Sequence, residues 1–417
     1  MNCSQSKLSF SSINNDKLKV LFETMKRGFQ MRNFVYLIVF ISFFDLFSQL
    51  PIMSPFADSL GATPFVIGLA VGIYSFSNMI GNVISGFMTD KRGPFLILVF
   101  GLFASAVSLL LYFAITDPVS LLGVRFIHGF MEGLIVPAAF TFLANRTEET
   151  NRGRSVAISG AFVGLAAIIG PAYGGIVAAK TSPAFVMAIN GIMMFLIAVA
   201  AFFVLRSFKY VRKKQISNNQ TRVRHLFRSP GMVRSFTGAF FLMFSQGVLA
   251  LVLPLKVVSL GFDAKTSGML LSAFGVTAVL IFLLPVNRIF DHVRPIITLA
   301  FGLSMMGISM LFLSQLEELN FLYISMIIYG IGFAFLFPSI NSLLIDSSSP
   351  EFRGKAYGYF YAFFSIGAVV GSSVIGLLDL EFSGSFLLTG IILIVIAVYS
   401  LIGNTKKNSF DNAPPIS

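Results

Sequence analysis

The amino-acid sequence predicts an all-α integral membrane protein, with twelve transmembrane helices in two related six-helix bundles. Composition, the spacing of apolar segments and an internal repeat all predict this fold class. Of the 417 residues, 56% are hydrophobic and only 12% are charged, whereas a soluble domain carries about 25% charged residues. The mean hydropathy is +0.84. A chain of this composition is expected to lie in lipid over most of its length.

Twelve apolar segments are each long enough, at about 20 residues, to cross the hydrocarbon core of a bilayer. The first six occupy residues 33–56, 64–88, 95–115, 119–144, 155–179 and 183–205. The second six occupy residues 233–256, 266–286, 296–314, 319–345, 354–378 and 384–403. The chain therefore divides into an N-terminal tail, an N-terminal bundle, a linker, a C-terminal bundle and a C-terminal tail, at residues 1–32, 33–205, 206–232, 233–403 and 404–417.

A repeat at an offset of about 200 residues relates the two halves. Arg152-Gly153-Arg154 is matched by Arg353-Gly354-Lys355, which lies 201 residues later. The same offset relates Gly129 to Gly330, Pro137 to Pro338, Gly170 to Gly371, and Gly175 to Gly376. An offset of 200 relates Ser59-Leu60-Gly61 and Gly68 to Ser259-Leu260-Gly261 and Gly268. Such a repeat is typical of transporters built from two related halves, with the substrate path between them.

Basic residues gather on one side of the predicted membrane. Of the 30 Lys and Arg residues, 26 lie in the tails, in the linker region and in the loops of the same face. By the positive-inside rule, this predicts that both termini are cytoplasmic. The net charge of +12 therefore reflects topology, and no nucleic-acid partner is expected. We expect a multi-pass protein of the cell membrane.

Cysteine and histidine give no sign of a cofactor or an enzyme. The single cysteine, Cys3, lies in the polar N-terminal tail, and the three histidines are dispersed. No disulfide framework or metal-ligand spacing follows from this pattern. A nucleophile–base pair for an intramembrane enzyme is also not visible, so we expect neither an enzyme nor a metal site.

The loop between the second and third spans, Gly86 to Gly93, is short enough to require a tight turn. Glycine permits positive φ and close helix approach. Asp90 and Arg92 can pair with each other or with a helix end, in contacts made in one conformation and broken in another. We therefore predict a gating loop formed by Gly86, Asp90, Arg92 and Gly93. The simpler interpretation is that these charges only set the topology.

The fifth span combines glycines with a proline. Gly170, Gly174 and Gly175 offer a surface on which a neighbouring helix can pack closely. Pro171 removes one helical donor and bends the segment. We predict that this motif is a pivot between conformations, although the same residues would also serve simple close packing.

Ionisable residues within spans are rare and are functional candidates by default. The first span holds Asp45, and the fourth holds Arg125, His128 and Glu132 on one helical face. We predict that these four residues couple transport to protons. The alternatives are a static ion pair between Asp45 and Arg125 and a structural hydrogen bond made by His128.

The residues that the repeat relates differ in chemistry between the two halves. At these offsets Asp45 corresponds to Ser245, while His128 and Glu132 correspond to Tyr329 and Phe333. The N-terminal half is therefore expected to handle protons, and the C-terminal half to offer an aromatic, apolar wall to the substrate. Polar residues of the first and second spans complete the predicted substrate pocket, which consists of Gln49, Tyr74, Asn78, Asn82, Tyr329 and Phe333.

These motifs together resemble those of the major facilitator superfamily over residues 33–403. The segment Gly86 to Gly93 looks like that family's hallmark loop, and Arg125 to Gly129 resembles its fourth-helix Arg-x-x-x-Gly motif. The segment Gly170 to Gly175 resembles the Gly-Pro-x-x-Gly-Gly signature of the twelve-span drug:proton antiporters. The segment at the end of the first span, Pro51 to Ala62, is similar to the end of the first helix in the same branch. Glu132 departs from the pattern, since the family usually has a small residue there.

The resemblance implies proton-coupled efflux of amphipathic or hydrophobic small molecules, such as drugs or a secreted metabolite, by alternating access. The proton gradient would be the energy source, with no cofactor, and a monomer would suffice. Two alternatives remain, namely an exporter dedicated to a siderophore or lipid-like product and a proton symporter for nutrient uptake. A symporter for a polar nutrient would need more charged or amide groups in the second half. The sequence does not identify the substrate.

Overall fold

The computed structural model of the chain describes residues 15–146, 152–206, 227, 229–283, 293–348 and 353–405, and their regular structure is helical throughout. The first half contains α1 (Asn15–Ser48), α2 (Met53–Ser59), α3 (Pro64–Arg92), α4 (Pro94–Leu110), the 3₁₀ helix η1 (Leu111–Ala114), α5 (Pro118–Gly133), α6 (Ile135–Arg146), α7 (Arg152–Lys180) and α8 (Pro183–Leu205). The second half contains α9 (Pro230–Ser259), α10 (Ala264–Leu283), α12 (Pro295–Gln315), α13 (Leu319–Ser347), α14 (Arg353–Leu378) and α15 (Phe382–Thr405).

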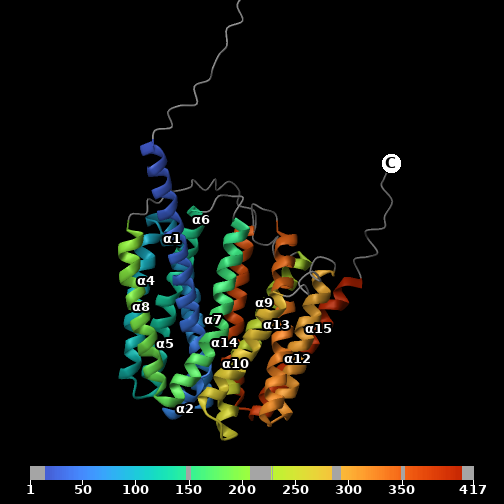
Figure 1. The fold of residues 1–417 in the computed structure, drawn as a ribbon. Coiled ribbons are helices and arrows are strands. Elements are labelled where there is room, and N and C mark those ends of the chain that lie inside the picture. The colour runs from blue at the N-terminus through green and yellow to red at the C-terminus, as the bar shows by residue number, and fades with distance from the viewer. Residues whose placement is uncertain are drawn as a thin grey trace, which may run out of the picture.

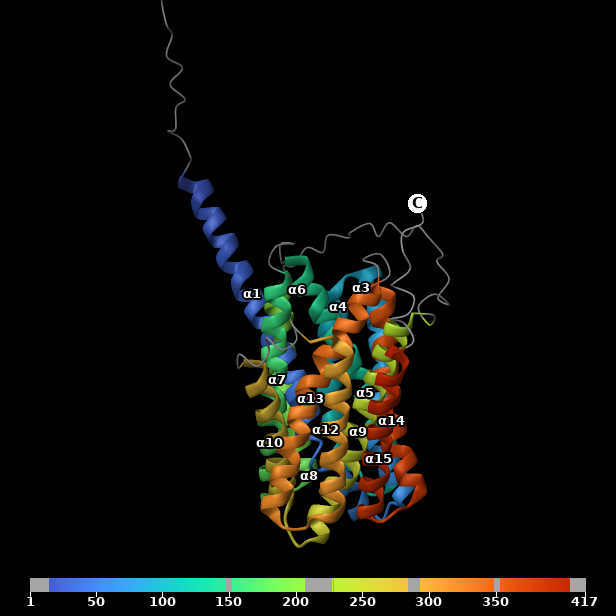
Figure 2. The ribbon, with the colours of Figure 1, turned by 90° about the vertical axis from the view of Figure 1, so that its right-hand side faces the viewer.

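The prediction of twelve membrane spans is confirmed. Twelve helical segments among the described residues are long and apolar enough to cross a bilayer, six in each half. Helices of the first half lie on the left of Figure 1 and those of the second half on the right, with α7, α10 and α14 between them. The start of α1 and the end of α15 lie toward the same end of the molecule (Figures 1 and 2). The assignment of that end to the cytoplasm stays a prediction.

Prolines mark where many of the spans begin. Proline occupies the first turn of α3, α4, α5, α8, α9 and α12. This position suits proline because its missing N–H has no helical acceptor there and its fixed φ is already helical. The adjacent glycines then turn the chain. Gly61, Gly93 and Gly261 have φ values of 78°, 83° and 85°, and Gly61 and Gly261 are equivalent in the repeat.

Two predicted spans differ from the observed helices. The first was expected to run over residues 33–56, but α1 ends at Ser48 and α2 begins at Met53. The cause is Pro51, because a helix usually ends before the residue that precedes a proline. The fourth predicted span, 119–144, is divided at Leu134 into α5 and α6. Pro137 cannot donate to the carbonyl four residues earlier, and this lost bond explains the break.

The glycines of α7 bring it into backbone contact with α1 and α10. A Cβ at Gly174 would lie 1.9 Å from the carbonyl oxygen of Ser48 in α1. A Cβ at Gly175 would lie 2.3 Å from the carbonyl oxygen of Ala264 in α10. One side of the motif therefore packs within its own bundle, and the other side packs against the second bundle. The predicted pivot role is not tested by this packing.

Two pseudo-symmetric contacts join the bundles at the end that lies away from the termini. One is formed by α7 and α10, and the other by α14 and α3. In the second contact, a Cβ at Gly68 would lie 2.3 Å from the carbonyl oxygen of Ser372, and one at Gly376 would lie 2.6 Å from that of Pro64. These glycines lie near the first turn of α3 and the last turn of α14. The backbones therefore touch at this end of the two bundles.

The contact at Gly174 predicts a sharp difference between two glycine-to-alanine substitutions. Gly174→Ala would push a methyl group against the α1 backbone, and such overpacking costs about 1–3 kcal/mol. Gly123→Ala, in α5, would meet no atom within 4 Å and should gain slightly from better helix propensity. Thermal unfolding in detergent should show a lower Tm for Gly174→Ala only. Equal Tm values for the two variants would contradict the packing.

Candidate functional site

The helix that carries most of the candidate site, α5, starts at a well-formed N-cap. The side chain of Asp117 accepts hydrogen bonds from the backbone N–H groups of Val119 and Ser120, at 2.9 and 3.0 Å. The Ser120 hydroxyl in turn faces the backbone N–H of Asp117, which completes a capping box. Hydrogen bonds from Ser120 and Val119 hold the pKa of Asp117 below its ordinary value. The cap therefore fixes the residue at which α5 starts. It thereby also fixes the rotation of the helix face that points into the bundle.

Close packing of α3 on α5 places an aromatic ring beside the site. A Cβ at Gly129 would lie 2.4 Å from the carbonyl oxygen of Tyr74, and one at Gly133 would lie 2.3 Å from that of Asn78. Only glycine permits this approach. It brings the Tyr74 ring to 5.2 Å from the His128 ring, measured between centroids, in an edge-to-face arrangement.

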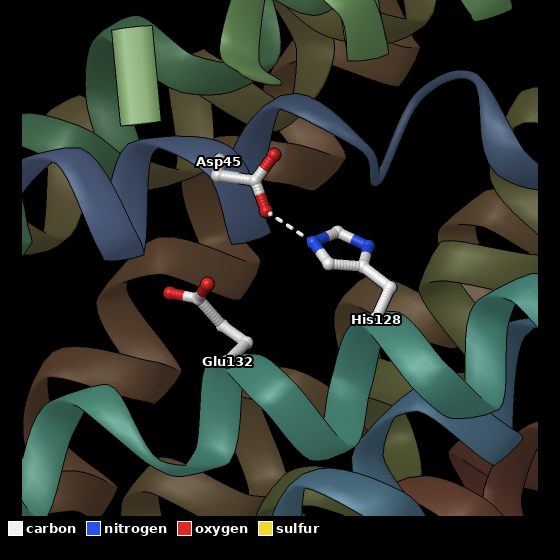
Figure 3. Close-up of side chains that lie close together, drawn as sticks. All are labelled: Asp45, His128 and Glu132. Carbon is white, nitrogen blue, oxygen red and sulfur yellow. Dashed lines mark ion pairs between the residues drawn. The ribbon is translucent and has the colours of Figure 1, made fainter. Parts of the chain in front are cut away.

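Asp45, His128 and Glu132 form a buried titratable cluster (Figure 3). Their exposed fractions are 1%, 0% and 3%. His128 Nε2 lies 3.1 Å from Asp45 Oδ2. The carboxylate of Glu132 points toward this pair from one turn further along α5, and one ligand atom of each residue lies within 4.8 Å of those of the other two. Two helices distant in sequence, α1 and α5, thus bring two acids and one base together.

Asp45 is held by side chains from α5, from α8 and from the turn that follows α1. Besides His128, its carboxylate accepts hydrogen bonds from Gln49 Nε2 and Asn190 Nδ2, each at 2.8 Å. Asn190, in α8, also donates to the Ser48 hydroxyl oxygen at 2.8 Å. Both oxygens of a fully buried carboxylate are therefore supplied with donors, as burial of such a charge requires.

Arg125 is linked to the cluster through the side-chain amide of Gln49. One terminal nitrogen of its guanidinium donates to Gln49 Oε1, and Gln49 donates to Asp45. Its Nε and its other terminal nitrogen donate to the carbonyl oxygens of Ala70 and Val71, at 2.8 and 3.3 Å. The guanidinium also lies 4.7 Å from the centroid of the Tyr74 ring. Gln49 thus bridges the cation and the acid, in place of the direct pair that was one alternative from the sequence.

Glu132 and His128 each have one buried polar atom without a hydrogen-bond partner, although His128 Nε2 lies within ion-pair distance of Asp45. Glu132 Oε2 accepts a 2.7 Å hydrogen bond from the Ser105 hydroxyl of α4. Its Oε1 has no hydrogen-bond partner, although the atom is buried, and the same holds for the Ser42 hydroxyl of α1. A buried carboxylate with one free oxygen is stabilised when that oxygen gains a proton or a ligand. His128, by comparison, has the Tyr112 hydroxyl 3.3 Å from its Nδ1.

The same three residues have the donor types of a metal site. Two carboxylates and one imidazole suit a divalent ion such as zinc. The sequence did not suggest this, because the dispersed histidines show no ligand spacing. The fold creates the combination by placing α1 beside α5.

The equivalent place in the second half contains a neutral copy of this arrangement. The Ser245 hydroxyl lies 2.8 Å from the Tyr329 hydroxyl, where the first half has Asp45 and His128. Phe274 meets the Tyr329 ring edge-to-face at 5.5 Å, as Tyr74 meets His128. Phe333, the counterpart of Glu132, lies 5.3 Å from Phe274. The two bundles share a geometry in which only the first has titratable groups.

The structure distributes the predicted pocket residues over several environments. Gln49 and Tyr74 belong to the network around Asp45 and Arg125, and Tyr329 is fully buried within the second bundle. Asn82 donates a 2.8 Å hydrogen bond to Asn78 on the same face of α3. Phe333 stacks on Phe337 with a centroid distance of 5.8 Å. Their role in substrate binding stays a prediction.

The predicted gating loop is a single-residue turn between α3 and α4. Gly93 connects the two helices, and its N–H donates to the carbonyl oxygen of Thr89 at 2.9 Å. Arg92 is exposed, and a Cβ at Gly86 would meet no atom within 4 Å. The side chain of Asp90 lies outside the described residues, so the gating hypothesis stays a prediction.

Sequence reasoning missed three members of the site, namely Asn190, Ser105 and Tyr112. Asn190 is a buried amide in α8, whose other residues are almost all apolar. That isolation was a usable signal, because a polar side chain within a span needs a partner. Ser105 and Tyr112 gave no comparable signal, since both are common in apolar helices.

Comparison with known proteins identifies a family relationship for both halves. The family model described as Major Facilitator Superfamily matches residues 35–239 and 235–415, which together cover nearly the whole chain.

Individual relatives agree with this match. An uncharacterized MFS-type transporter of Methanocaldococcus jannaschii is 24% identical over 366 residues, covering 84% of this chain and 92% of the relative. Multidrug resistance protein 2 of Bacillus subtilis is 22% identical over 399 residues, covering 92% and 98%. Among solved structures, a bacterial homolog of the human lysosomal transporter Spinster, in an inward-facing and unoccupied conformation, superimposes with a TM-score of 0.75. It is 12% identical and covers 94% of this chain and 99% of its own.

The bridging position of Gln49 leads to a stability prediction. Gln49→Leu removes the donor to Asp45 and the acceptor of Arg125, which leaves two buried charged groups with an unmet hydrogen bond. Such a loss costs about 1–3 kcal/mol for each group, so Tm in detergent should fall clearly. Gln315→Leu is the control, because Gln315 is exposed at the end of α12 and bonds only the neighbouring Ser314 among the described contacts. A fall of the same size in both variants would contradict the bridge.

Proposed function

The chain belongs to the major facilitator superfamily, and we propose that it is a proton-coupled exporter of amphipathic or hydrophobic small molecules. The proposal has two parts, the coupling ion and the kind of substrate. The cluster of Asp45, His128 and Glu132 supports the first part. The apolar character of the second bundle supports the second, together with the names of relatives such as multidrug resistance protein 2.

Proton coupling rests on a charge balance within the cluster. An unbalanced charge inside a membrane bundle is unfavourable. Arg125, linked through Gln49, balances one of the two carboxylates. One proton, held either by His128 or by Glu132, balances the other. The cluster can therefore hold one exchangeable proton at net neutrality, and loss of that proton leaves a negative charge.

The order of these groups along α5 suits proton movement across the bilayer. With a rise of about 1.5 Å per residue, Arg125, His128 and Glu132 lie about 10, 15 and 21 Å from the start of the helix. That start faces away from the termini. Passing from His128 to Glu132, a proton would advance about 6 Å toward the end that carries the termini.

We infer the state of the transport cycle from the contacts that join the two bundles at one end of the molecule. If the termini are cytoplasmic, the contacts between α7 and α10 and between α3 and α14 close the outer side. The cluster would then release its proton to the inside in this state, and the substrate would be loaded from the same side. Reopening the outer side would release the substrate and accept the next proton, which is the sequence an antiporter requires.

The second bundle presents aromatic rings without titratable partners at the equivalent place. The rings form a chain of contacts in the order Tyr329, Phe274, Phe333 and Phe337. Such a wall suits flat or apolar substrates, including drugs and lipid-like secreted products. We place the protein in the cell membrane as a working monomer, energised by the proton gradient alone.

The proposal predicts the behaviour of two conservative variants in inverted vesicles. An acid lumen should drive accumulation of fluorescent amphipathic cations such as ethidium by the wild type. Asp45→Asn and Glu132→Gln should each reduce this accumulation to the level of vesicles without the protein, because the exchangeable proton is lost. Binding of a neutral dye should survive in both variants. Ser245→Ala, which alters the neutral counterpart of Asp45 and lies outside the proposed aromatic wall, should keep gradient-driven accumulation.

The decisive measurement is substrate-induced proton release from reconstituted protein, in variants against wild type. Normal release in both single variants and in the double variant would contradict the assignment and point to His128 or to another ion. Wild-type accumulation that is lost on chelation of divalent cations and restored by zinc would instead assign the cluster to a metal.

A further inference from the structure

A serine of the second bundle inserts its hydroxyl into the backbone of a helix of the first. Ser272, in α10, donates a 2.7 Å hydrogen bond to the carbonyl oxygen of Ile168. The same hydroxyl accepts a 3.0 Å hydrogen bond from the backbone N–H of Ala172. In an ideal helix these two groups of α7 would bond each other across one turn. The hydroxyl of one bundle therefore bonds both the donor and the acceptor of one helical turn in the other bundle.

Pro171 makes this insertion possible. A proline inside a helix has no N–H to donate, and its ring pushes against the carbonyl four residues earlier, here that of Ala167. The Ser272 hydroxyl bonds the carbonyl of Ile168 and the N–H of Ala172, which lie next to the helical bond that Pro171 removes. Insertion of a side chain into the helical ladder is a known cause of a local bend.

The packing around Ser272 allows only a small residue to approach. A Cβ at Gly268 would lie 2.2 Å from the carbonyl oxygen of Pro171, and one at Gly275 would lie 2.8 Å from that of Ala167. The two backbones thus touch one turn before Ser272 and almost one turn after it. The hydroxyl sits at the centre of the contact between bundles.

The other inter-bundle contact lacks this feature. At the offsets of the repeat, Ser272 corresponds to Gly72 of α3, and Pro171 corresponds to Ser372 of α14. No proline interrupts α14, and the Ser372 hydroxyl bonds the carbonyl oxygens of Ala368 and Val369 in its own helix. The insertion is therefore not required by the fold, since the pseudo-symmetric contact forms without it.

We propose that Ser272 is a conformational latch that holds the α7–α10 end of the two bundles closed by completing the broken turn at Pro171. The bundles can separate at this end only when the hydroxyl leaves α7. The N–H of Ala172 and the carbonyl of Ile168 are then free to bond each other, which restores the turn. The shape of α7 is thereby coupled to the contact between bundles, independently of which ion drives transport.

The proposal predicts a shift between conformations when the hydroxyl is removed. Two hydrogen bonds of ordinary net strength correspond to about a tenfold change in the ratio of closed to open states. Spin labels at Lys180→Cys and Lys265→Cys, at the exposed ends of α7 and α10, report on this end. They are attached in a Cys3→Ser background, so that no other thiol is present. Pulsed electron resonance distances in Ser272→Ala should show a longer population that is about tenfold enriched over the same chain with Ser272.

Matched variants separate the latch from a general loss of packing. Ser372→Ala, in the equivalent contact, should leave the distance distribution unchanged. Pro171→Ala should lengthen the distances between the spin labels as Ser272→Ala does. The double variant should show no further shift, because both substitutions act on the same latch. Ser272→Gly, which copies Gly72, should behave like Ser272→Ala. An unchanged distribution in well-folded Ser272→Ala or Ser272→Gly, or additive shifts in the double variant, would overturn the proposal.

Discussion

The buried carboxylate of Asp45 is the constraint on which the candidate site depends. An ionised group inside a membrane bundle is tolerated only while other side chains replace its water. His128 and Asn190 do this from α5 and α8, and Gln49 does so from the turn that follows α1. Each of these partners must hold its helix or turn at a particular rotation and distance. The packing of the first bundle is therefore tied to one charge, and any change in that charge is transmitted to three helices.

The two halves show how one architecture can separate two tasks. Ser245 and Tyr329 repeat the contact of Asp45 and His128 with neutral hydroxyl groups. The backbone geometry of the contact is thus independent of charge. Only one of the two equivalent sites carries charged side chains. Under the proposed function, an ion site on one bundle and a substrate wall on the other would be coupled through the rigid-body movement of one bundle against the other.

Under the latch proposal, glycine and proline in α7 have different roles in that movement. Gly174 fastens α7 to α1 within its bundle, whereas Pro171 opens the turn that Ser272 of the opposite bundle enters. The same short motif therefore has a fixed side and a releasable side. A pure glycine surface would pack closely on both sides and would offer no group whose hydrogen bonding changes between states.

The sequence alone determined the fold class, the twelve spans, the two halves and the residues with titratable side chains, because hydropathy, charge distribution and repeats are properties of single segments. It also placed Arg125, His128 and Glu132 on one face, since helical periodicity is local. Only the tertiary structure decided the partners. It showed that Gln49 lies between Arg125 and Asp45 and that Asn190 donates to the Asp45 carboxylate. These contacts depend on which helices are neighbours and on how each helix is rotated. The sequence of one helix does not reveal which helix packs against it.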